Sequence, residues 1–231
     1  MTEKKERIAK KMADAGLCSR REAERWILSG RVQVNGKVLE TPACVVGDED
    51  TVLVDGKPLA QKSQTRVWMY HKPAGLIVSA RDPQGRSTIF EHLPKNMPRV
   101  ISVGRLDLNS EGLLLLTNDG AWARKMELPA NGWERTYRVR VHGIVSGEML
   151  GRLGKGVKID GIQYAPCQVE VERKQGTNTW LKMTLHEGKN REIRKLMKFF
   201  GLEVSRLIRI SYGPYQLGTL KPGAVQEAPC A

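Results

Sequence analysis

The stretch VISVGRLDLNSEGLLLLTNDG, residues 100–120, predicts a strand, a loop and a second strand. Strand-type residues lead into Gly104-Arg105-Leu106-Asp107, and an apolar run, Leu113–Leu116, follows a polar turn. The loop presents one carboxylate, Asp107, and one guanidinium, Arg105, between two strands, where functional residues are often displayed. Taken alone, so short a string more often holds a turn aspartate and a surface arginine. The rest of the chain has to decide between these interpretations.

The charge of the chain indicates a polyanionic partner. Its 231 residues include 38 Lys and Arg against 25 Asp and Glu, a net charge of +13. Residues 1–60 hold 11 basic and 10 acidic groups, which leaves 27 basic and 15 acidic groups in residues 61–231. A protein this basic usually binds nucleic acid.

The cysteines and the N-terminus exclude several classes of protein. The four cysteines form no C-x-x-C pair, so their spacing does not favour a zinc site. The N-terminus is polar, and no apolar run is long enough to span a bilayer. We therefore expect a cytoplasmic protein without a membrane segment or a metal.

The first sixty residues predict a small module of two helices followed by short strands. One helix is expected over residues 4–15 and a second over Arg20–Leu28, with Ser19 as its N-cap. The Asn-Gly and Asp-Gly turns in RVQVNGKV and TVLVDGKPL predict hairpins. The run AGLCSRREAERWILSGRVQVNGKVL, followed by TVLVDGKPL, resembles the S4 domain, an RNA-binding module. The resemblance implies RNA phosphate contacts by Arg20, Arg21, Arg25, Arg31 and Lys37.

Residues 61–65 form a short polar linker, and a second domain is expected over residues 66–231. Strict alternation in ERTYRVRVH, residues 134–142, predicts a strand with Arg138, Arg140 and His142 on an exposed basic face. Further strand candidates lie at residues 157–160, 167–173, 179–185 and 203–210. The predicted fold class is α+β, with a mainly antiparallel sheet in the second domain.

The sequence NREIRKLMKFF, residues 190–200, gives the clearest helix of the second domain. Its apolar positions follow the i, i+3, i+4, i+7 spacing of a buried stripe. Arg191 falls on the face opposite this stripe, and Arg194 falls at its edge.

Three segments of the second domain together resemble one enzyme family. They are GRLD at residues 104–107, ERTY at residues 134–137 and EGKNREIRK at residues 187–195. With the S4-like module in front, the chain is similar to pseudouridine synthases of the RsuA/RluB type. The resemblance implies an RNA cleft across the sheet and an isomerase without metal or redox cofactor. Such an enzyme breaks the C1′–N1 bond of a uridine and rejoins C1′ to C5 of the same base.

The resemblance also implies roles for individual residues. Asp107 is the catalytic carboxylate, as nucleophile or base, and Arg194 is the cation paired with it. Tyr137 stacks on the flipped uracil, and Arg105 holds the flipped nucleotide or fills its place. The pocket walls are expected to include Ile193 and Leu196.

Two alternatives come from other classes of protein. One is a non-catalytic S4-type RNA-binding protein that assists ribosome assembly; the joint presence of Asp107, Tyr137 and Arg194 argues against it. The other is an aminoacyl-tRNA synthetase, but no H-I-G-H-like or K-M-S-K-S-like string occurs. Within the family, residues 106–120 and RLIRISYGP are more similar to the branch that modifies large-subunit (23S) ribosomal RNA, and the small-subunit branch stays open. We expect a monomer whose partner is ribosomal RNA or a pre-ribosomal particle.

Overall fold

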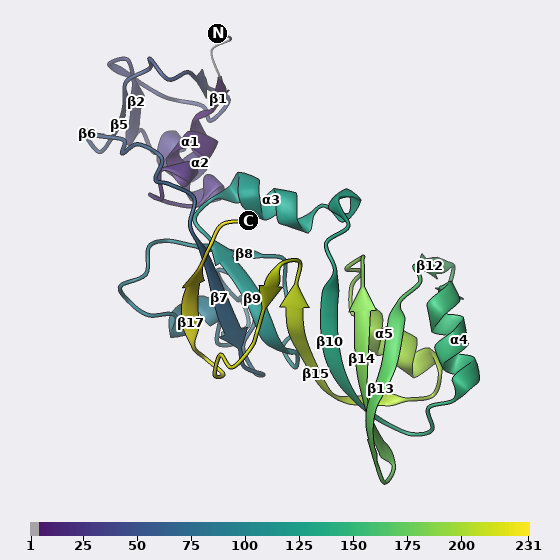
Figure 1. Ribbon diagram of the computed structural model, residues 1–231. Helices are drawn as coiled ribbons and strands as arrows, with labels where there is room; N and C mark the ends of the chain where they lie inside the picture. The colour runs from purple at the N-terminus through teal and green to yellow at the C-terminus, as the bar shows by residue number, and fades with distance from the viewer. Residues whose placement is uncertain (1–4) are drawn as a thin grey trace. The chain divides into compact units, whose positions relative to one another are not determined.

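The computed structural model describes residues 5–231, shown in Figure 1. The first four residues of the predicted N-terminal module, including Lys4 of its first predicted helix, lie outside the described residues. The chain divides into two compact units. The first unit is the chain up to Thr65 together with Met97–Ile101 and Asn118–Gly120, and the second unit is the remainder.

The first unit contains two helices and small strand pairs around one core. The helices are α1 (Ile8–Asp14) and α2 (Arg20–Leu28). Ser19 caps α2, because its Oγ accepts a hydrogen bond from the backbone of Glu22 at 3.2 Å. The strands are β1 (Glu6–Arg7), β2 (Val32–Val34), β3 (Lys37–Val38), β4 (Val45–Val46), β5 (Val52–Val54) and β6 (Lys57–Pro58). They pair as β1-β4 and, in a four-stranded sheet, as β3-β2-β5-β6.

The start of the first helix differs from its prediction. Residues 6 and 7 are extended, because Glu6 and Arg7 pair with Val46 and Val45 of β4. The helix therefore begins at Ile8. Its apolar side chains Ile8 and Met12 are fully buried in the core of this unit.

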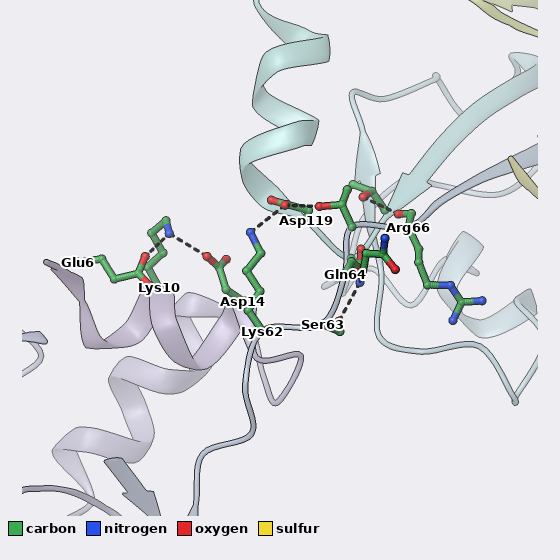
Figure 2. Close-up of polar contacts among 11 residues, drawn as sticks. Glu6, Lys10, Asp14, Lys62, Ser63, Gln64, Arg66 and Asp119 are labelled. Carbon is green, nitrogen blue, oxygen red and sulfur yellow. Dashed lines mark hydrogen bonds and ion pairs between the residues drawn. The ribbon is translucent and has the colours of Figure 1, made fainter. Parts of the chain in front are cut away.

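The polar segment before Arg66 makes defined contacts within the first unit (Figure 2). The Asp119 carboxylate accepts hydrogen bonds from Lys62 Nζ at 2.8 Å and Thr65 Oγ1 at 2.7 Å. Asn118 Nδ2 donates to Ser63 Oγ and to Gln64 O. The segment predicted as a linker is therefore held by side chains of residues 118 and 119, which directly follow the strand β9 (Glu111–Thr117).

The second unit is built on a mixed sheet whose strand order is β13-β14-β10-β15-β9-β7-β17, with β8 beside β9 and β16 beside β15. The pair β15–β9 is parallel, whereas β13–β14, β14–β10, β10–β15, β9–β7 and β7–β17 are antiparallel. The strands are β7 (Val67–Lys72), β8 (Ile101–Val103), β9 (Glu111–Thr117), β10 (Arg135–His142), β13 (Gln168–Gln175), β14 (Asn178–Leu185), β15 (Glu203–Tyr212), β16 (Tyr215–Gln216) and β17 (Val225–Ala228). The predicted mainly antiparallel sheet is confirmed.

Two strands meet closely at the parallel join. Gly112 of β9 lies opposite Arg209 of β15 with φ +102°. A Cβ at this position would lie 2.2 Å from the Arg209 carbonyl oxygen. Only glycine fits here, because it has no Cβ and tolerates a positive φ. The loop that carries Asp107 leads directly into this junction.

Two helices, α4 (Gly147–Lys155) and α5 (Glu192–Phe199), pack against one face of the sheet around β10 and β14. A third helix, α3 (Gly120–Glu127), follows β9; η1 (Ile89–His92) and η2 (Pro129–Asn131) are short 3₁₀ turns, and β11 (Val157–Ile159) pairs with β12 (Ile162–Tyr164). Ile193, Leu196 and Met197 of α5 join Val139 and Leu181 in one core cluster. Within residues 5–231, no helix is both long enough and apolar enough to cross a membrane.

Candidate active site

Asp107 lies on the loop between β8 and β9. Gly104 opens this loop with φ +68°, and its backbone N–H donates to Glu127 Oε1 at 2.6 Å. The Asp107 carbonyl accepts a hydrogen bond from the backbone of Ser110 at 3.0 Å, which closes a turn. The side chain of Asp107 is 30% exposed. The loop therefore holds a partly accessible carboxylate on a fixed backbone.

A buried lysine holds this loop from the end of β7. Lys72 is fully buried, and its Nζ donates to the carbonyls of Leu108 at 3.3 Å and Ser110 at 2.8 Å, as well as to Pro73 at 2.9 Å. The backbone N–H of Gly75 donates to Leu108 O at 2.9 Å. Burial lowers the pKa of Lys72 to about 8, although the carboxylates of Asp107 and Glu111 oppose this shift.

The cation nearest to Asp107 is not the predicted one. Arg191 Nη1 lies 3.3 Å from Asp107 Oδ2, within hydrogen-bonding distance. Arg194 Nε lies 3.9 Å from the same oxygen, too far for a hydrogen bond. The terminal nitrogens of Arg194 instead donate to Val204 O at 3.2 Å and to Asn109 O at 3.0 Å. Arg194 therefore lies within ion-pair distance of Asp107 while its terminal nitrogens bind two backbone carbonyls, and its role as the partner of Asp107 stays a prediction.

Arg194 still contributes to the electrostatics around Asp107. Its side chain is 16% exposed, and burial lowers the pKa of its guanidinium, with Arg191 acting in the same direction and Asp107 against it. An arginine stays protonated despite such a shift. It therefore places a fixed positive charge near Asp107 while it holds Asn109, two residues further along the same loop.

The turn before α5 directs Arg191 toward the carboxylate. Arg191 precedes the helix in the left-handed conformation, with φ 51° and ψ 34°. The buried carboxylate of Glu192 accepts a hydrogen bond from the backbone N–H of Lys189 at 2.9 Å. The carboxylate of Glu187 accepts one from Ala165 N at 2.9 Å and another from Lys189 Nζ. Burial raises the pKa of Glu192 to about 7.

Asp107 lines a cavity of about 930 Å³ in the second unit. Tyr137 of β10 and Ile193 of α5 form part of its wall, and the exposed Arg105 also borders it. Leu196 does not contribute as predicted. It is 1% exposed in the core, because it lies nearly one turn beyond Ile193 and packs under α5.

A second group of cations in this cavity was not predicted. Arg135 and Arg209 are buried, and their Cζ atoms lie 4.5 Å and 5.0 Å from the centre of the Tyr212 ring. Arg135 Nη2 donates to Tyr212 Oη at 2.9 Å, and Arg209 Nε donates to Leu113 O at 2.7 Å. Among the described residues, Arg209 Nη2 has no hydrogen-bond partner. The alternation of their strands could have placed both arginines on the inner face.

Comparison with known protein families identifies both parts of the chain. The family described as RNA pseudouridylate synthase matches residues 66–199, and the S4 domain matches residues 6–52. The chain belongs to the RNA pseudouridylate synthase family. The order of an S4 domain and then a synthase domain agrees with the predicted RsuA/RluB type.

Curated relatives agree with this family. An uncharacterized RNA pseudouridine synthase of Rickettsia felis is 48% identical to this chain, over 96% of each chain. The ribosomal large subunit pseudouridine synthase B of Haemophilus influenzae is 43% identical, over 92% of this chain and 61% of its own length. A solved pseudouridylate synthase has the same fold, with a TM-score of 0.69, 24% identity and 96% of each chain covered. This chain is therefore an RNA pseudouridine synthase, an isomerase, rather than a non-catalytic assembly factor.

The S4 domain of this synthase presents part of the predicted basic set to solvent. Arg20, Arg21 and Lys37 are exposed and make no ion pair within the described residues. Arg31 instead forms a bidentate ion pair with Asp55: its Nε and Nη2 donate to the two carboxylate oxygens at 2.9 and 2.5 Å.

Two further members of the set have neighbours of their own. Arg31 also stacks on Trp26 at 4.3 Å. Arg25 lies 4.0 Å from Glu22. Among the described residues, the members of the predicted set whose charge is not paired with a carboxylate are thus Arg20, Arg21 and Lys37.

Proposed function

We propose that this synthase isomerises a specific uridine of ribosomal RNA, in the 23S RNA of the large subunit, with Asp107 as its catalytic carboxylate. The reaction breaks the C1′–N1 bond of the uridine, turns the base, and joins C1′ to C5 of the same base. The proton on C5 is released and N1 takes up a proton, so the product is an isomer of the uridine. One ionised carboxylate in a closed pocket is sufficient, because the departing base is retained and reused.

The observation that carries this proposal is the state of the carboxylates in the cavity. The carboxylates other than Asp107 that line it among the described residues have structural partners: Asp82 with Arg86, Glu127 with the backbone of Gly104, and Glu187 and Glu192 in the turn before α5. Asp107 has one long hydrogen bond from Arg191 and a second guanidinium 3.9 Å away. It therefore stays available to a substrate, with two guanidiniums nearby.

The walls of the cavity suit a uracil ring. Tyr137 is half-buried on β10 and presents an aromatic face for stacking, and Ile193 offers an apolar contact. The target uridine has to leave its stack to reach a carboxylate at this depth. Arg105 is exposed beside the cavity, where it can contact the phosphate of the displaced nucleotide.

The choice of RNA rests on the relatives and on the charge of the chain. The name of the Haemophilus influenzae relative refers to the ribosomal large subunit. The net charge of +13 favours a large polyanion. An S4 domain with exposed Arg20 and Arg21 adds a second contact for such an RNA.

The test uses Asp107→Asn, which keeps the shape of the side chain and removes its charge. We expect tritium release from 5-tritiated uridine in 23S RNA fragments to fall below about a thousandth of the wild-type rate, while RNA affinity changes little. Asp160→Asn is the matched control, because Asp160 is exposed on the β11–β12 hairpin. Release by Asp107→Asn at the wild-type rate would exclude Asp107 as the catalytic group.

A comparison of pseudouridines in cells with and without the protein tests the RNA target. We expect one position of 23S RNA to lose its modification. Loss in small-subunit RNA instead would refute the assignment to the large subunit.

A further inference from the structure

The face of the sheet away from Asp107 is open and basic. Along β10, Tyr137, Val139 and Val141 pack toward the core cluster that contains α5, so Arg138 and Arg140 point to the other side. In Figure 1, α5 lies behind β14 and β13, and the described residues place no helix in front of β10, β14 and β13. We call this surface of β13, β14, β10 and β15 the outer face.

The strand register aligns one row of side chains across the outer face. Arg140 of β10 lies opposite Arg206 of β15 on one side and opposite Trp180 of β14 on the other. Trp180 in turn lies opposite Arg173 of β13. Directly opposite residues in a sheet have Cβ atoms about 5 Å apart. The row is therefore Arg206, Arg140, Trp180 and Arg173, with an aromatic ring between guanidiniums.

A second row of cations lies beside the first. Arg138 is opposite Lys182, and the Arg138 guanidinium stacks on Trp180 at 5.0 Å. Like charges placed directly opposite each other destabilise a sheet. Both Arg206–Arg140 and Arg138–Lys182 are such pairs, so folding alone does not explain this arrangement.

Carboxylates offset only part of this charge. Glu111 pairs with Arg206 at 2.9 Å, Glu172 with Arg138 at 2.7 Å, and Glu170 with Lys182 at 3.5 Å. Within residues 5–231, Arg140 and Arg173 have no carboxylate partner. These two arginines flank the half-buried Trp180 in the first row.

We propose that the outer face is a second RNA-binding surface, on which Arg140 and Arg173 contact phosphates and Trp180 stacks on an unpaired base. An antiparallel sheet with an aromatic ring on a central strand is an effective platform for single-stranded RNA. Guanidiniums on either side of the ring match the backbone that runs past a stacked base. Charge complementarity favours RNA over a protein partner.

This surface extends the proposed function and depends on it only for the identity of the RNA. It lies on the face opposite the inner side chains Tyr137 and Leu207, which line the Asp107 cavity. The segment bound there is therefore distinct from the target uridine. It anchors the RNA outside the cavity and takes no part in the isomerisation.

The test combines Arg140→Glu with Arg173→Glu in the full chain. We expect the Kd for a single-stranded 23S RNA fragment that contains the target uridine to rise about tenfold or more, and the slope of log K against log salt to fall by about one to two. The rate of tritium release at saturating RNA should stay at the wild-type value. Lys158→Glu with Lys221→Glu is the matched control, because both lysines are exposed on other parts of the same unit.

Trp180 provides an independent measurement. Trp180→Phe keeps an aromatic ring, whereas Trp180→Leu removes the stacking face, so only the second should weaken binding, by about tenfold. Wild-type RNA affinity and salt slope in the double glutamate variant would overturn the proposal. It would also be overturned if the double glutamate variant lost modification in cells while its RNA affinity stayed unchanged, because that result would indicate a protein partner. Failure of the proposed function is distinguishable, since the wild-type protein would then bind RNA without releasing tritium.

Discussion

Replacement of Glu192 by glutamine tests the electrostatics of the turn that carries Arg191. Glu192 is 5% exposed, and burial raises the pKa of its carboxyl from 4.5 to about 7; the neighbouring Glu187 adds to this shift, although a hydrogen bond from Lys189 N opposes it. The folded protein therefore binds this proton more tightly than the unfolded chain does. The resulting stabilisation is fully present below about pH 4.5 and is lost as the pH rises through about 7.

The size of the effect follows from the two pKa values. A change from 4.5 to about 7 corresponds to about 3 kcal/mol of unfolding free energy. Glutamine has almost the same shape and keeps an oxygen that can accept from Lys189 N, but it does not titrate. Above about pH 7 the wild-type protein keeps a buried charge beside Glu187, which the variant avoids. Glu192→Gln should therefore gain about 3 kcal/mol relative to the wild type between about pH 4.5 and pH 8.

Urea denaturation of the wild type and the variant at about pH 5 and about pH 8 measures this change. Glu148→Gln is the control, because Glu148 also lies in the first turn of its helix, α4, but is exposed. The control should shift by less than about 0.5 kcal/mol between the two conditions. If Glu192→Gln changes stability by the same amount at both pH values, Glu192 does not take up a proton near pH 7 and the reasoning is wrong.

Two further substitutions test how the Asp107 loop is held. Gly112→Ala should cost more than about 3 kcal/mol of unfolding free energy and reduce tritium release, since its Cβ would meet the Arg209 carbonyl at 2.2 Å. Gly104→Ala is the control and should cost only about 1–2 kcal/mol, because a Cβ there has no neighbour within 4 Å. Equal losses of stability in the two variants would contradict this account. Lys72→Met removes the donor to three carbonyls, so we expect about 3 kcal/mol of destabilisation and slower tritium release, measured by thermal unfolding and by turnover; unchanged values would exclude a supporting role.

Local signals predicted most of the secondary structure. The alternation in residues 134–142 became β10, the apolar stripe of residues 190–200 became α5, and Ser19 caps α2. Each of these depends on side chains close in sequence, where period and capping chemistry are informative. The sequence of Val225–Ala228 did not predict strand β17, because this strand forms through its pairing with β7, about 155 residues earlier. Such long-range pairing leaves only a weak local pattern.

Local sequence patterns also do not predict the parallel pairing of β9 with β15. Leu113–Leu116 predicted a buried strand, but their periodicity does not say which neighbour the strand takes. Gly112 was the available signal, since a glycine at the start of a buried strand often marks a close backbone approach. The local sequence around it, residues 109–112, predicts only a polar turn.

The position of Arg191 shows why one residue of helix boundary matters at a site. A helix that starts at residue 190 places Arg191 about 200° from Ile193, on the solvent face. The observed helix starts at Glu192, and Arg191 adopts a left-handed conformation that costs a non-glycine residue about 1–2 kcal/mol. The Glu192 carboxylate accepts a hydrogen bond from Lys189 N across this turn. Because Arg191 leaves the helical period, its guanidinium reaches Asp107 while Arg194, still within the period, reaches the loop backbone.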